Sequence, residues 1–240
     1  MSSKPFFIQK LIEESGLDAP KILELGCGTA RYMPEILKKY PGIVYTGLEP
    51  LATSYATAVS NIGALPQVTL YNRLGYGDLP NIAPESFDIV FSISALEHVK
   101  DFRAFITMSG KYVKKGGLLV HRYDLGHALY PGSLKERVHV FLGNTVPGVL
   151  PVNKFVRYVP ENEVTTLCSA VDCIPFKSTY HQMPNHKSLE KASVGNETLE
   201  GALALLYAWE WQHEKSFSQL PTTTREALFP SVAVWTRKKQ

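Results

Sequence analysis

Short apolar runs alternate with helical patterns over the first half of the chain. Five of the apolar runs are rich in β-branched residues and bounded by Gly, Pro or Asn, which is typical of buried strands; they lie at residues 21–26, 43–50, 67–72, 87–94 and 117–125. Segments with helical spacing that end at Gly or Pro lie between them, at residues 30–42, 51–63 and 101–117. Strand and helix in this order pair through right-handed crossovers. The pattern therefore predicts an α/β fold with a doubly wound, mostly parallel sheet.

The pattern changes after residue 125. Residues 126–160 are rich in Pro, Gly, Val and aromatic residues and have no clean period, which favours a lid or acceptor insertion. A helix start at residue 160 and a strand at residues 173–184 follow. We expect a single domain over residues 1–240, with a cofactor-binding half at 1–125, the lid at 126–160, and a C-terminal half at 161–240 that completes the sheet.

A helical insertion is expected at residues 197–220. Its apolar residues spread widely round the helix axis, as in a buried or covered helix; they include Leu199, Leu203, Leu206 and Trp209. Three interpretations stay open for this helix: packing in the core, a second wall of an acceptor pocket, or a dimer surface.

Composition and charge limit the classes of molecule that the protein can be expected to bind. Hydrophobic residues make up 45% of the 240 residues and charged residues 20%, as in an ordinary globular protein. The formal net charge is +3 without a basic stripe, which argues against nucleic acid and favours a small-molecule acceptor. The start of the chain lacks a signal-peptide pattern, and the longest apolar stretch, residues 201–209, is far short of the ~20 residues that span a bilayer. We expect a cytoplasmic protein without membrane attachment, as monomer or homodimer.

The most specific chemistry lies where the first two strands end. Gly26 and Gly28 follow the first strand, where a ligand can approach bare backbone at the edge of the sheet. The second strand ends at Glu49, whose carboxylate can accept the hydroxyls of a ribose. A dinucleotide fingerprint has a third glycine where this chain has Arg31, which disfavours a nicotinamide or flavin cofactor, and the P-loop pattern is absent from the sequence.

Four motifs together resemble a known family. The stretches ILELGCGTARY at 22–32, GLEP at 47–50, FDIVFSISALEHVKD at 87–101 and YVKKGGLLV at 112–120 look like the first, second, fourth and fifth motifs of class I S-adenosylmethionine-dependent methyltransferases. The resemblance covers roughly residues 20–125, with order, spacing and strand placement in agreement. It implies a Rossmann-like, seven-stranded sheet whose last strand, near residues 231–238, runs antiparallel beside the sixth.

The resemblance also implies which residues bind S-adenosyl-L-methionine. Glu24, Gly26 and Gly28 would frame its methionine part, and Glu49 would hold the ribose hydroxyls. Asp78 is a candidate for the adenine contact, against the alternative of a turn-forming loop residue. The full set of implied cofactor-binding residues is Glu24, Gly26, Cys27, Gly28, Glu49, Pro50, Asp78, Ser94, Ala95 and Leu96.

Catalytic residues are less strongly indicated. His127, in a loop beyond the fifth strand, is the freest candidate for a general base, because its ordinary pKa lies near working pH. The other candidates are His98, Tyr123 and Asp124, and a structural role for His98 is weighed against a catalytic one. A metal site from His121, Asp124 and His127 is conceivable, but nothing in the sequence fixes its geometry, and we predict no metal.

The activity that the resemblance implies is transfer of a methyl group to a small molecule. The acceptor atom would attack in line and leave S-adenosyl-L-homocysteine as the product, with oxygen in a sugar or another metabolite as the expected nucleophile. The alternative is a binding or regulatory subunit that keeps the methyltransferase fold without catalysis.

Overall fold

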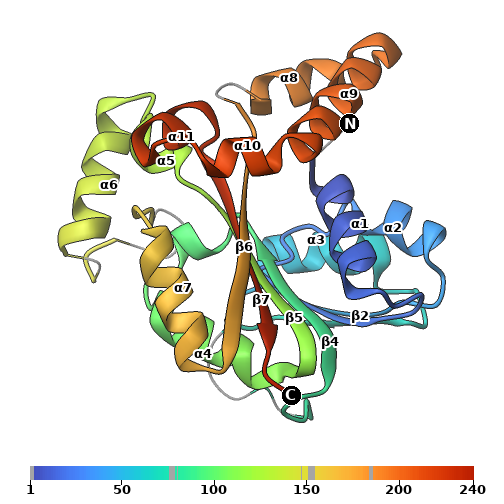
Figure 1. Ribbon diagram of the computed structural model, residues 1–240. Coiled ribbons are helices and arrows are strands. Elements are labelled where there is room, and N and C mark those ends of the chain that lie inside the picture. Colours follow the sequence, from blue (N-terminus) through green and yellow to red (C-terminus); the bar gives the residue numbers. More distant parts are fainter. Residues whose placement is uncertain (1–2, 76–78, 80, 147, 151–154, 184–185) are drawn as a thin grey trace.

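The computed structural model describes residues 3–75, 79, 81–146, 148–150, 155–183 and 186–240 (Figure 1). Its centre is a seven-stranded sheet, which consists of β1 (Lys21–Leu25), β2 (Val44–Leu48), β3 (Val68–Tyr71), β4 (Phe87–Ile93), β5 (Val113–Asp124), β6 (Cys173–His181) and β7 (Ser231–Lys238). The strand order is β3-β2-β1-β4-β5-β7-β6. Strands β1 to β5 pair in parallel, and β7 runs antiparallel to both β5 and β6. The predicted fold class is confirmed.

Helices cover both faces of this sheet (Figure 1). On one face lie α1 (Ser3–Ser15), α2 (Met33–Lys39) and α3 (Ala52–Ile62), and on the other lie α4 (Phe102–Tyr112) and α7 (Glu161–Ala170). Adjacent strand residues serve opposite layers, because side chains alternate across a strand. Ile22 packs in the core under α1 and α2, whereas Leu23 packs in the core under α4 and α7.

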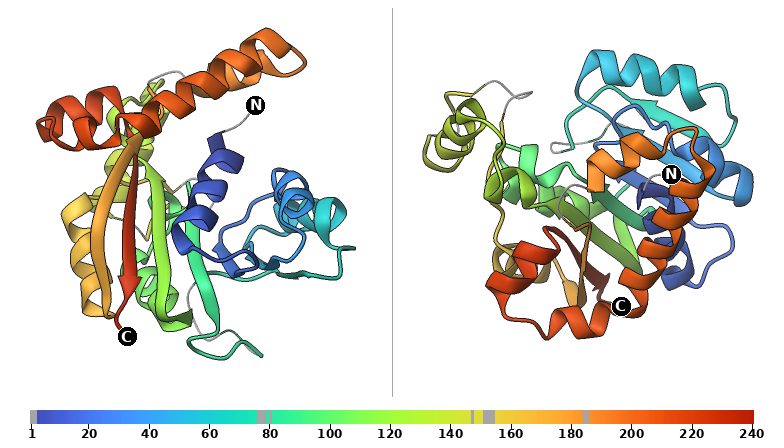
Figure 2. Two further views of the ribbon diagram at one scale, coloured as in Figure 1. Left: turned by 45° about the vertical axis from the view of Figure 1, so that its right-hand side comes forward. Right: turned by 90° about the horizontal axis from the view of Figure 1, so that it is seen from above.

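The remaining helices lie beyond the strands' carboxyl ends. They are η1 (Leu96–His98, a 3-10 turn), α5 (Gly126–Leu129), α6 (Leu134–Thr145), α8 (His186–Ser193), α9 (Glu197–Gln212), α10 (Glu214–Ser218) and α11 (Thr222–Leu228). Figure 2 shows α9 and α10 crossing over the end of the sheet, next to the start of α1. A candidate acceptor site at this edge therefore has helices above it.

The predicted helical insertion at 197–220 is only partly covered. Leu203 and Tyr207 of α9 are buried, but Leu205 is 74% exposed and Trp209 is 41% exposed. No described helix is long and apolar enough to cross a membrane.

The sequence pattern predicted none of five helices in the described structure: α1, α5, α6, α8 and α11. Helix α1 buries Phe7, Ile8 and Leu11 against the sheet. Helix α6 lies within the predicted lid, and Ser133 caps its first turn by accepting a hydrogen bond from the Glu136 amide at 3.2 Å. The one buried residue of α6 is Gly143, so the helix has no core-facing apolar stripe that a pattern search could detect.

Strand β5 begins four residues earlier than predicted. Helix α4 ends at Tyr112, and Val113 already pairs with Phe87 before the register shifts ahead of Ile89. Gly116 adopts φ +75° in this irregular stretch, a conformation that favours glycine. Gly116 and its neighbour Gly117 therefore lie in a bulge inside the strand, whereas the sequence pattern assigned both to the end of a helix.

Candidate active site

Glu24 is held near the carboxyl end of β1 by two tyrosines. Its side chain is fully buried at the end of β1. The Tyr32 hydroxyl donates to Oε1, and the Tyr45 hydroxyl donates to Oε2 at 2.6 Å. Burial raises the pKa of Glu24, and the two hydrogen bonds oppose that shift. Sequence analysis named Glu24 only as a cofactor-binding candidate and did not identify the tyrosines.

Gly47 makes the contact between Tyr45 and Glu24 possible. Gly47 lies opposite Glu24 in the parallel pairing of β1 and β2. A Cβ at this position would lie 3.0 Å from the Tyr45 hydroxyl and 3.0 Å from the Cys27 Sγ. The glycine of the GLEP motif thus leaves the space through which the hydroxyl reaches the carboxylate. The register and the motif together contain the signal that could have found Tyr45.

The loop after β1 turns back on the neighbouring strand. The amides of Gly26 and Cys27 both donate to the Leu48 carbonyl, at 2.8 and 2.9 Å. Gly26 has φ +81°, and a Cβ there would lie 2.8 Å from the Cβ of Ala95, in the loop after β4. Gly28 also has a positive φ, +59°. Both glycines are therefore required by backbone conformation, and Gly26 also by close approach.

Glu49 ties the loops after β1 and β2 together. Its Oε2 accepts a hydrogen bond from the Gly28 amide and its Oε1 accepts one from the Leu51 amide, both at 2.9 Å. The side chain is 6% exposed. A carboxylate offers about four lone-pair sites, so each oxygen retains capacity for a further donor. The geometry suits a ligand with two adjacent hydroxyl groups.

The other predicted cofactor residues surround this pair of loops. Cys27 is buried, and burial raises the pKa of its thiol. The Pro50 carbonyl accepts from the Asn72 side chain at 3.2 Å. Ser94 adopts φ +53° and begins the turn that contains Leu96, which is fully buried. Asp78 lies outside the described residues.

Lys4 of α1 lies against the same edge, and sequence reasoning missed it. Its Nζ lies 5.2 Å from the centre of the Tyr32 ring. Burial lowers the pKa of Lys4, while the negative charge of Glu24 opposes that shift. The first turn of α1 thus brings a cation toward the buried carboxylate. The relation joins residues 20 positions apart in the chain but on separate elements, so no local motif shows it.

Glu97 and His98 form the next part of the site, in the η1 turn after β4. Glu97 is fully buried, its Oε1 accepts from the Asp124 amide at 3.2 Å, and its Oε2 has no hydrogen-bond partner within the described part of the chain. Burial raises the Glu97 pKa, and the neighbouring His98 opposes the shift. The ring nitrogen Nδ1 of His98 lies 2.9 Å from the Phe155 carbonyl oxygen.

The end of the predicted lid reaches the same turn. The Arg157 amide donates to the Glu97 carbonyl at 3.0 Å, and the Phe155 carbonyl meets His98. These contacts place residues 155–157 beside η1. Sequence analysis named Glu97 only as part of a motif and did not identify its role beside His98.

Asp124 and His127 approach from the end of β5. The Oδ1 of Asp124 accepts from the Gly126 amide at 2.8 Å, and its Oδ2 lies 3.7 Å from Nε2 of His127. The His127 ring lies 5.5 Å, centre to centre, from the ring of His98. Three of the four predicted catalytic residues are therefore brought together, with both imidazoles partly exposed.

Tyr123 and His121 lie apart from this cluster. Tyr123 is fully buried in the core under α4 and α7, and its hydroxyl is among the buried atoms without a hydrogen-bond partner in the described structure. His121 lies between Ser92 and Ser109, whose hydroxyls are 2.9 and 3.0 Å from its two ring nitrogens. Burial lowers its pKa to about 3. The alternation of side chains along β5 separates these two side chains from Asp124.

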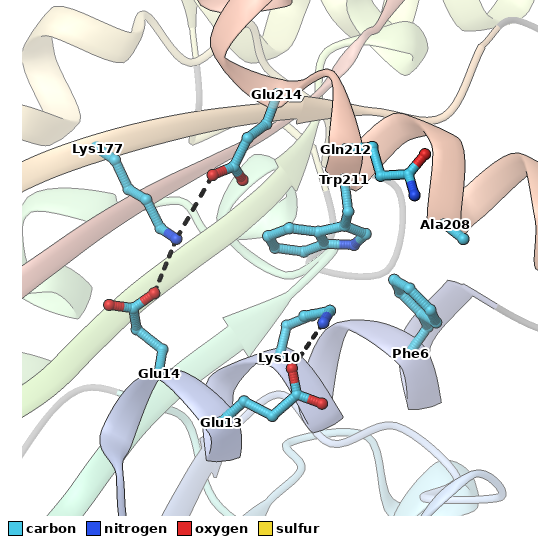
Figure 3. A pocket seen from close by; sticks show the side chains of 9 residues that line it. All are labelled: Phe6, Lys10, Glu13, Glu14, Lys177, Ala208, Trp211, Gln212 and Glu214. Atoms are coloured by element: carbon cyan, nitrogen blue, oxygen red, sulfur yellow. Dashed lines mark hydrogen bonds and ion pairs between the residues drawn. The ribbon is translucent and has the colours of Figure 1, made fainter.

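A cavity of about 610 Å³ lies elsewhere, between α1, β6, α9 and α10 (Figure 3). Trp211 and Phe6 form part of its lining, and Lys177 joins Glu14 and Glu214 across it, at 2.9 and 3.9 Å. None of the predicted site residues lines it. This cavity is therefore distinct from the glycine loop and the histidine cluster.

A comparison with known families identifies the domain that contains Gly26 and Gly28. Residues 23–119 match the family described as a methyltransferase domain. The chain carries a class I S-adenosylmethionine-dependent methyltransferase domain. The predicted family is thus confirmed, and S-adenosyl-L-methionine is the cofactor of that family.

Individual relatives of the methyltransferase domain match over part of the chain. A ubiquinone biosynthesis O-methyltransferase from Rhizobium leguminosarum is 29% identical over 103 residues, which is 43% of this chain and 40% of the relative. A trans-aconitate 2-methyltransferase from Deinococcus radiodurans is 25% identical over 107 residues, 45% of this chain and 39% of the relative. The matched region thus spans about two fifths of the length of these curated relatives.

A solved structure supports the same fold over nearly the whole chain. Phosphoethanolamine N-methyltransferase 2 from Haemonchus contortus, in complex with S-adenosyl-L-methionine, has a TM-score of 0.63 at 17% identity and covers 97% of this chain and 52% of its own. At this identity the likeness concerns the fold. The C-terminal half, outside the matched domain, therefore belongs to the same architecture.

Proposed function

We propose that this protein transfers the methyl group of S-adenosyl-L-methionine to an oxygen atom of a small-molecule acceptor. The observation that carries the proposal is the position of Glu49, whose carboxylate is fixed by the Gly28 and Leu51 amides at the carboxyl edge of the sheet. Doubly wound sheets bind ligands at this edge. The relatives that match the domain act, by their names, on small molecules.

The residues at this edge fit the cofactor. Gly26 lets the loop pack closely against Ala95, where a Cβ would clash, and its bare backbone would lie beside the methionine part. Glu49 would accept the two ribose hydroxyls through the lone pairs that its backbone donors leave. Glu24, held by the hydroxyls of Tyr32 and Tyr45, would supply a carboxyl group toward the methionine ammonium. When bound, the cofactor supplies a methyl group on a positively charged sulfur.

The acceptor would lie at the neighbouring edge, over His98, Asp124 and His127. The protein's task is to hold the acceptor oxygen in line with the methyl group, which replaces a bimolecular encounter by a fixed geometry. A weakly acidic hydroxyl must also lose its proton, and these side chains are the groups that can receive it. Residues 155–157 and helices α9 and α10 would limit the size of the acceptor and exclude water.

Calorimetric titration of Glu49→Ala tests the proposal. The wild type should bind S-adenosyl-L-methionine and S-adenosyl-L-homocysteine, and the variant should lose affinity by roughly ten- to hundredfold, about 1.5 to 3 kcal/mol, because charge-assisted contacts to the ribose are removed. Glu35→Ala, an exposed carboxylate on nearby α2, is the matched control and should bind as the wild type does.

Two other results would change the proposal. Absence of binding by the wild type would refute it. Binding without methyl transfer to a panel of hydroxylated acceptors would instead support a binding or regulatory subunit that keeps the fold.

A further inference from the structure

We propose that Glu97, His98 and His127 form a binding site for a divalent transition-metal cation at the acceptor edge. One ligand atom from each of the three side chains lies within 4.8 Å of the other two. Two imidazoles and one carboxylate are a common ligand set for Zn²⁺ and related cations, and this set leaves coordination positions open. No residue outside η1 and α5 is needed to complete it.

The first support is the state of Glu97. This side chain is fully buried, yet its Oε2 has no hydrogen-bond partner in the described structure. A buried carboxylate oxygen without a partner carries a large free-energy cost. The neighbouring Oε1 is occupied by the Asp124 amide, so the carboxylate is held in place while one oxygen remains available. A cation bound to Oε2 would compensate its burial.

The second support is the orientation of His98. The Phe155 carbonyl can only accept a hydrogen bond, so Nδ1 of His98, 2.9 Å away, must carry the proton. The other nitrogen, Nε2, then has a lone pair in the neutral ring, and it lies 3.9 Å from Oε1 of Glu97. Metal-binding histidines are commonly oriented in this way, with the second ring N–H donated to a carbonyl.

The third support is that a small movement would bring the three ligand atoms to metal-binding distances. Ligand atoms bound at about 2.0 to 2.2 Å from one cation lie roughly 3 to 4 Å apart, slightly closer than the atoms do here. The side chain of His127 is 42% exposed, so rotation of its ring can make the difference while His98 keeps its hydrogen bond to the Phe155 carbonyl. Asp124 lies behind His127, with Oδ2 at 3.7 Å from its Nε2, and can orient that ring or add a fourth oxygen.

The role of the metal site in methyl transfer rests on the proposed function, whereas the geometry of the site is independent of that function. A cation at this position would bind the acceptor's hydroxyl oxygen through an open coordination position. The bound hydroxyl would then lose its proton more readily, to Asp124 or to water, and its oxygen would form the new bond to the methyl carbon as the carbon–sulfur bond breaks. Acceptors with two neighbouring oxygen atoms would bind best, because they can chelate the cation.

The experiment is a metal titration of the full chain after treatment with a chelator. Zn²⁺ would be titrated by calorimetry and Co²⁺ by visible absorption, without cofactor or acceptor. We expect one equivalent of metal at micromolar affinity or better, and a Co²⁺ spectrum that indicates nitrogen and oxygen ligands. His98→Ala and His127→Ala should each lower the affinity by about tenfold or more, as removal of a metal-site residue does.

The controls separate the possible outcomes. His213→Ala removes a histidine that contacts Trp209, away from the cluster, and should bind metal as the wild type does. Circular dichroism identifies any variant that fails to fold, and Glu97→Gln provides a third, isosteric test. Weak or absent binding by the wild type, or binding that the cluster variants leave unchanged, would overturn the site.

The metal site and the proposed function can fail separately. Metal binding that persists in a protein that does not bind S-adenosyl-L-methionine would refute only the proposed function. Cofactor binding without a metal site would leave the methyl transfer intact and refute only this inference.

Discussion

Two neighbouring parts of the proposed site are built in opposite ways. The cofactor edge is the part around Glu24, Gly26 and Glu49, and the acceptor edge is the part around Glu97, His98 and His127. At the cofactor edge, backbone atoms define the shape: two glycines with positive φ, amides that share the Leu48 carbonyl, and a carboxylate fixed by two more amides. At the acceptor edge, the side chains of Glu97, His98 and His127 meet backbone groups of Asp124, Phe155 and Arg157. The first edge is built mainly from residues 24–28 and 45–51, two neighbouring segments, whereas the second is assembled from residues 97–98, 124–127 and 155–157.

This difference teaches which half of an active site a single sequence can reveal. Backbone requirements leave Gly, Pro and acidic residues at fixed spacings, which a motif captures. Side-chain assemblies depend on how distant elements pack, and they leave no local signal. Three predictions test this contrast, from the largest expected effect to the smallest.

The first prediction concerns Arg122, a buried cation of β5 that joins β7 to α1. Its Nε donates to Ser231 at 3.0 Å and its Nη2 to Ser3 at 3.3 Å, while attraction to the buried Glu210 opposes the effect of burial on its pKa. Arg122→Met should lower the free energy of unfolding by about 3 to 5 kcal/mol, because it leaves a buried charge uncompensated. Urea denaturation measures this change.

A surface arginine provides the comparison for that variant. Arg103→Met removes an exposed ion pair with Glu163 and should cost less than about 1 kcal/mol. Equal effects for the two variants would mean that the buried network contributes nothing beyond an ordinary surface contact.

The second prediction concerns the backbone-built edge. Gly26→Ala should weaken S-adenosyl-L-methionine binding by roughly a hundredfold, about 2.8 kcal/mol, because the new Cβ meets Ala95 and the φ of +81° becomes strained. Calorimetric titration measures the affinity. Gly16→Ala introduces similar strain at φ +68° with nothing within 4 Å of the Cβ, so it should reduce stability but not affinity. A Gly26→Ala protein with wild-type affinity would contradict the assignment.

The third prediction concerns the pH dependence of folding through His121. Burial holds its pKa at about 3, whereas in the unfolded chain it is near 6.5. Below pH 6.5 the unfolded state binds a proton that the folded state excludes, so this group lowers the free energy of unfolding as the pH falls, by up to about 1.4 kcal/mol per pH unit. His121→Gln should remove that slope between pH 6.5 and 5, measured by urea denaturation at each pH.

Other buried groups do not confuse this comparison. Burial raises the pKa of Glu24 and of Glu97, which contribute in the opposite direction, and lowers the pKa of His181, which contributes in the same direction. All three groups are present in both proteins and affect both slopes equally. Ser109→Ala is the control, because it removes one hydrogen bond to the ring and retains the imidazole. Its slope should match the wild type, and a slope that His121→Gln leaves unchanged would show that another group is responsible.

The sequence predicted much of the fold, because strands that are buried on both faces are continuous apolar runs. Such runs can be recognised without knowing which strands pair. It failed where no such signal exists. The exposed α6 lacks a buried stripe, and the glycines of β5 suggested a helix end although they form a bulge. The predicted lid and domain boundaries stay predictions.

At the site, the same limit applies. The positions of Gly26, Gly28 and Glu49 followed from spacing, but the partners of Glu24 did not. Tyr45 reaches that carboxylate because Gly47 has no side chain, which becomes visible only when β1 and β2 are placed in register. Lys4 required knowledge of how α1 packs.

The aromatic contacts of α1 provide a built-in optical reporter. All three tryptophans of the chain lie in its last third, and two of them contact this helix. The ring of Trp211 lies 6.2 Å from that of Phe7, and the ring of Trp235 lies 5.4 Å from it. Intrinsic fluorescence therefore senses whether the helix that carries Lys4 stays docked when ligands enter, without any added dye.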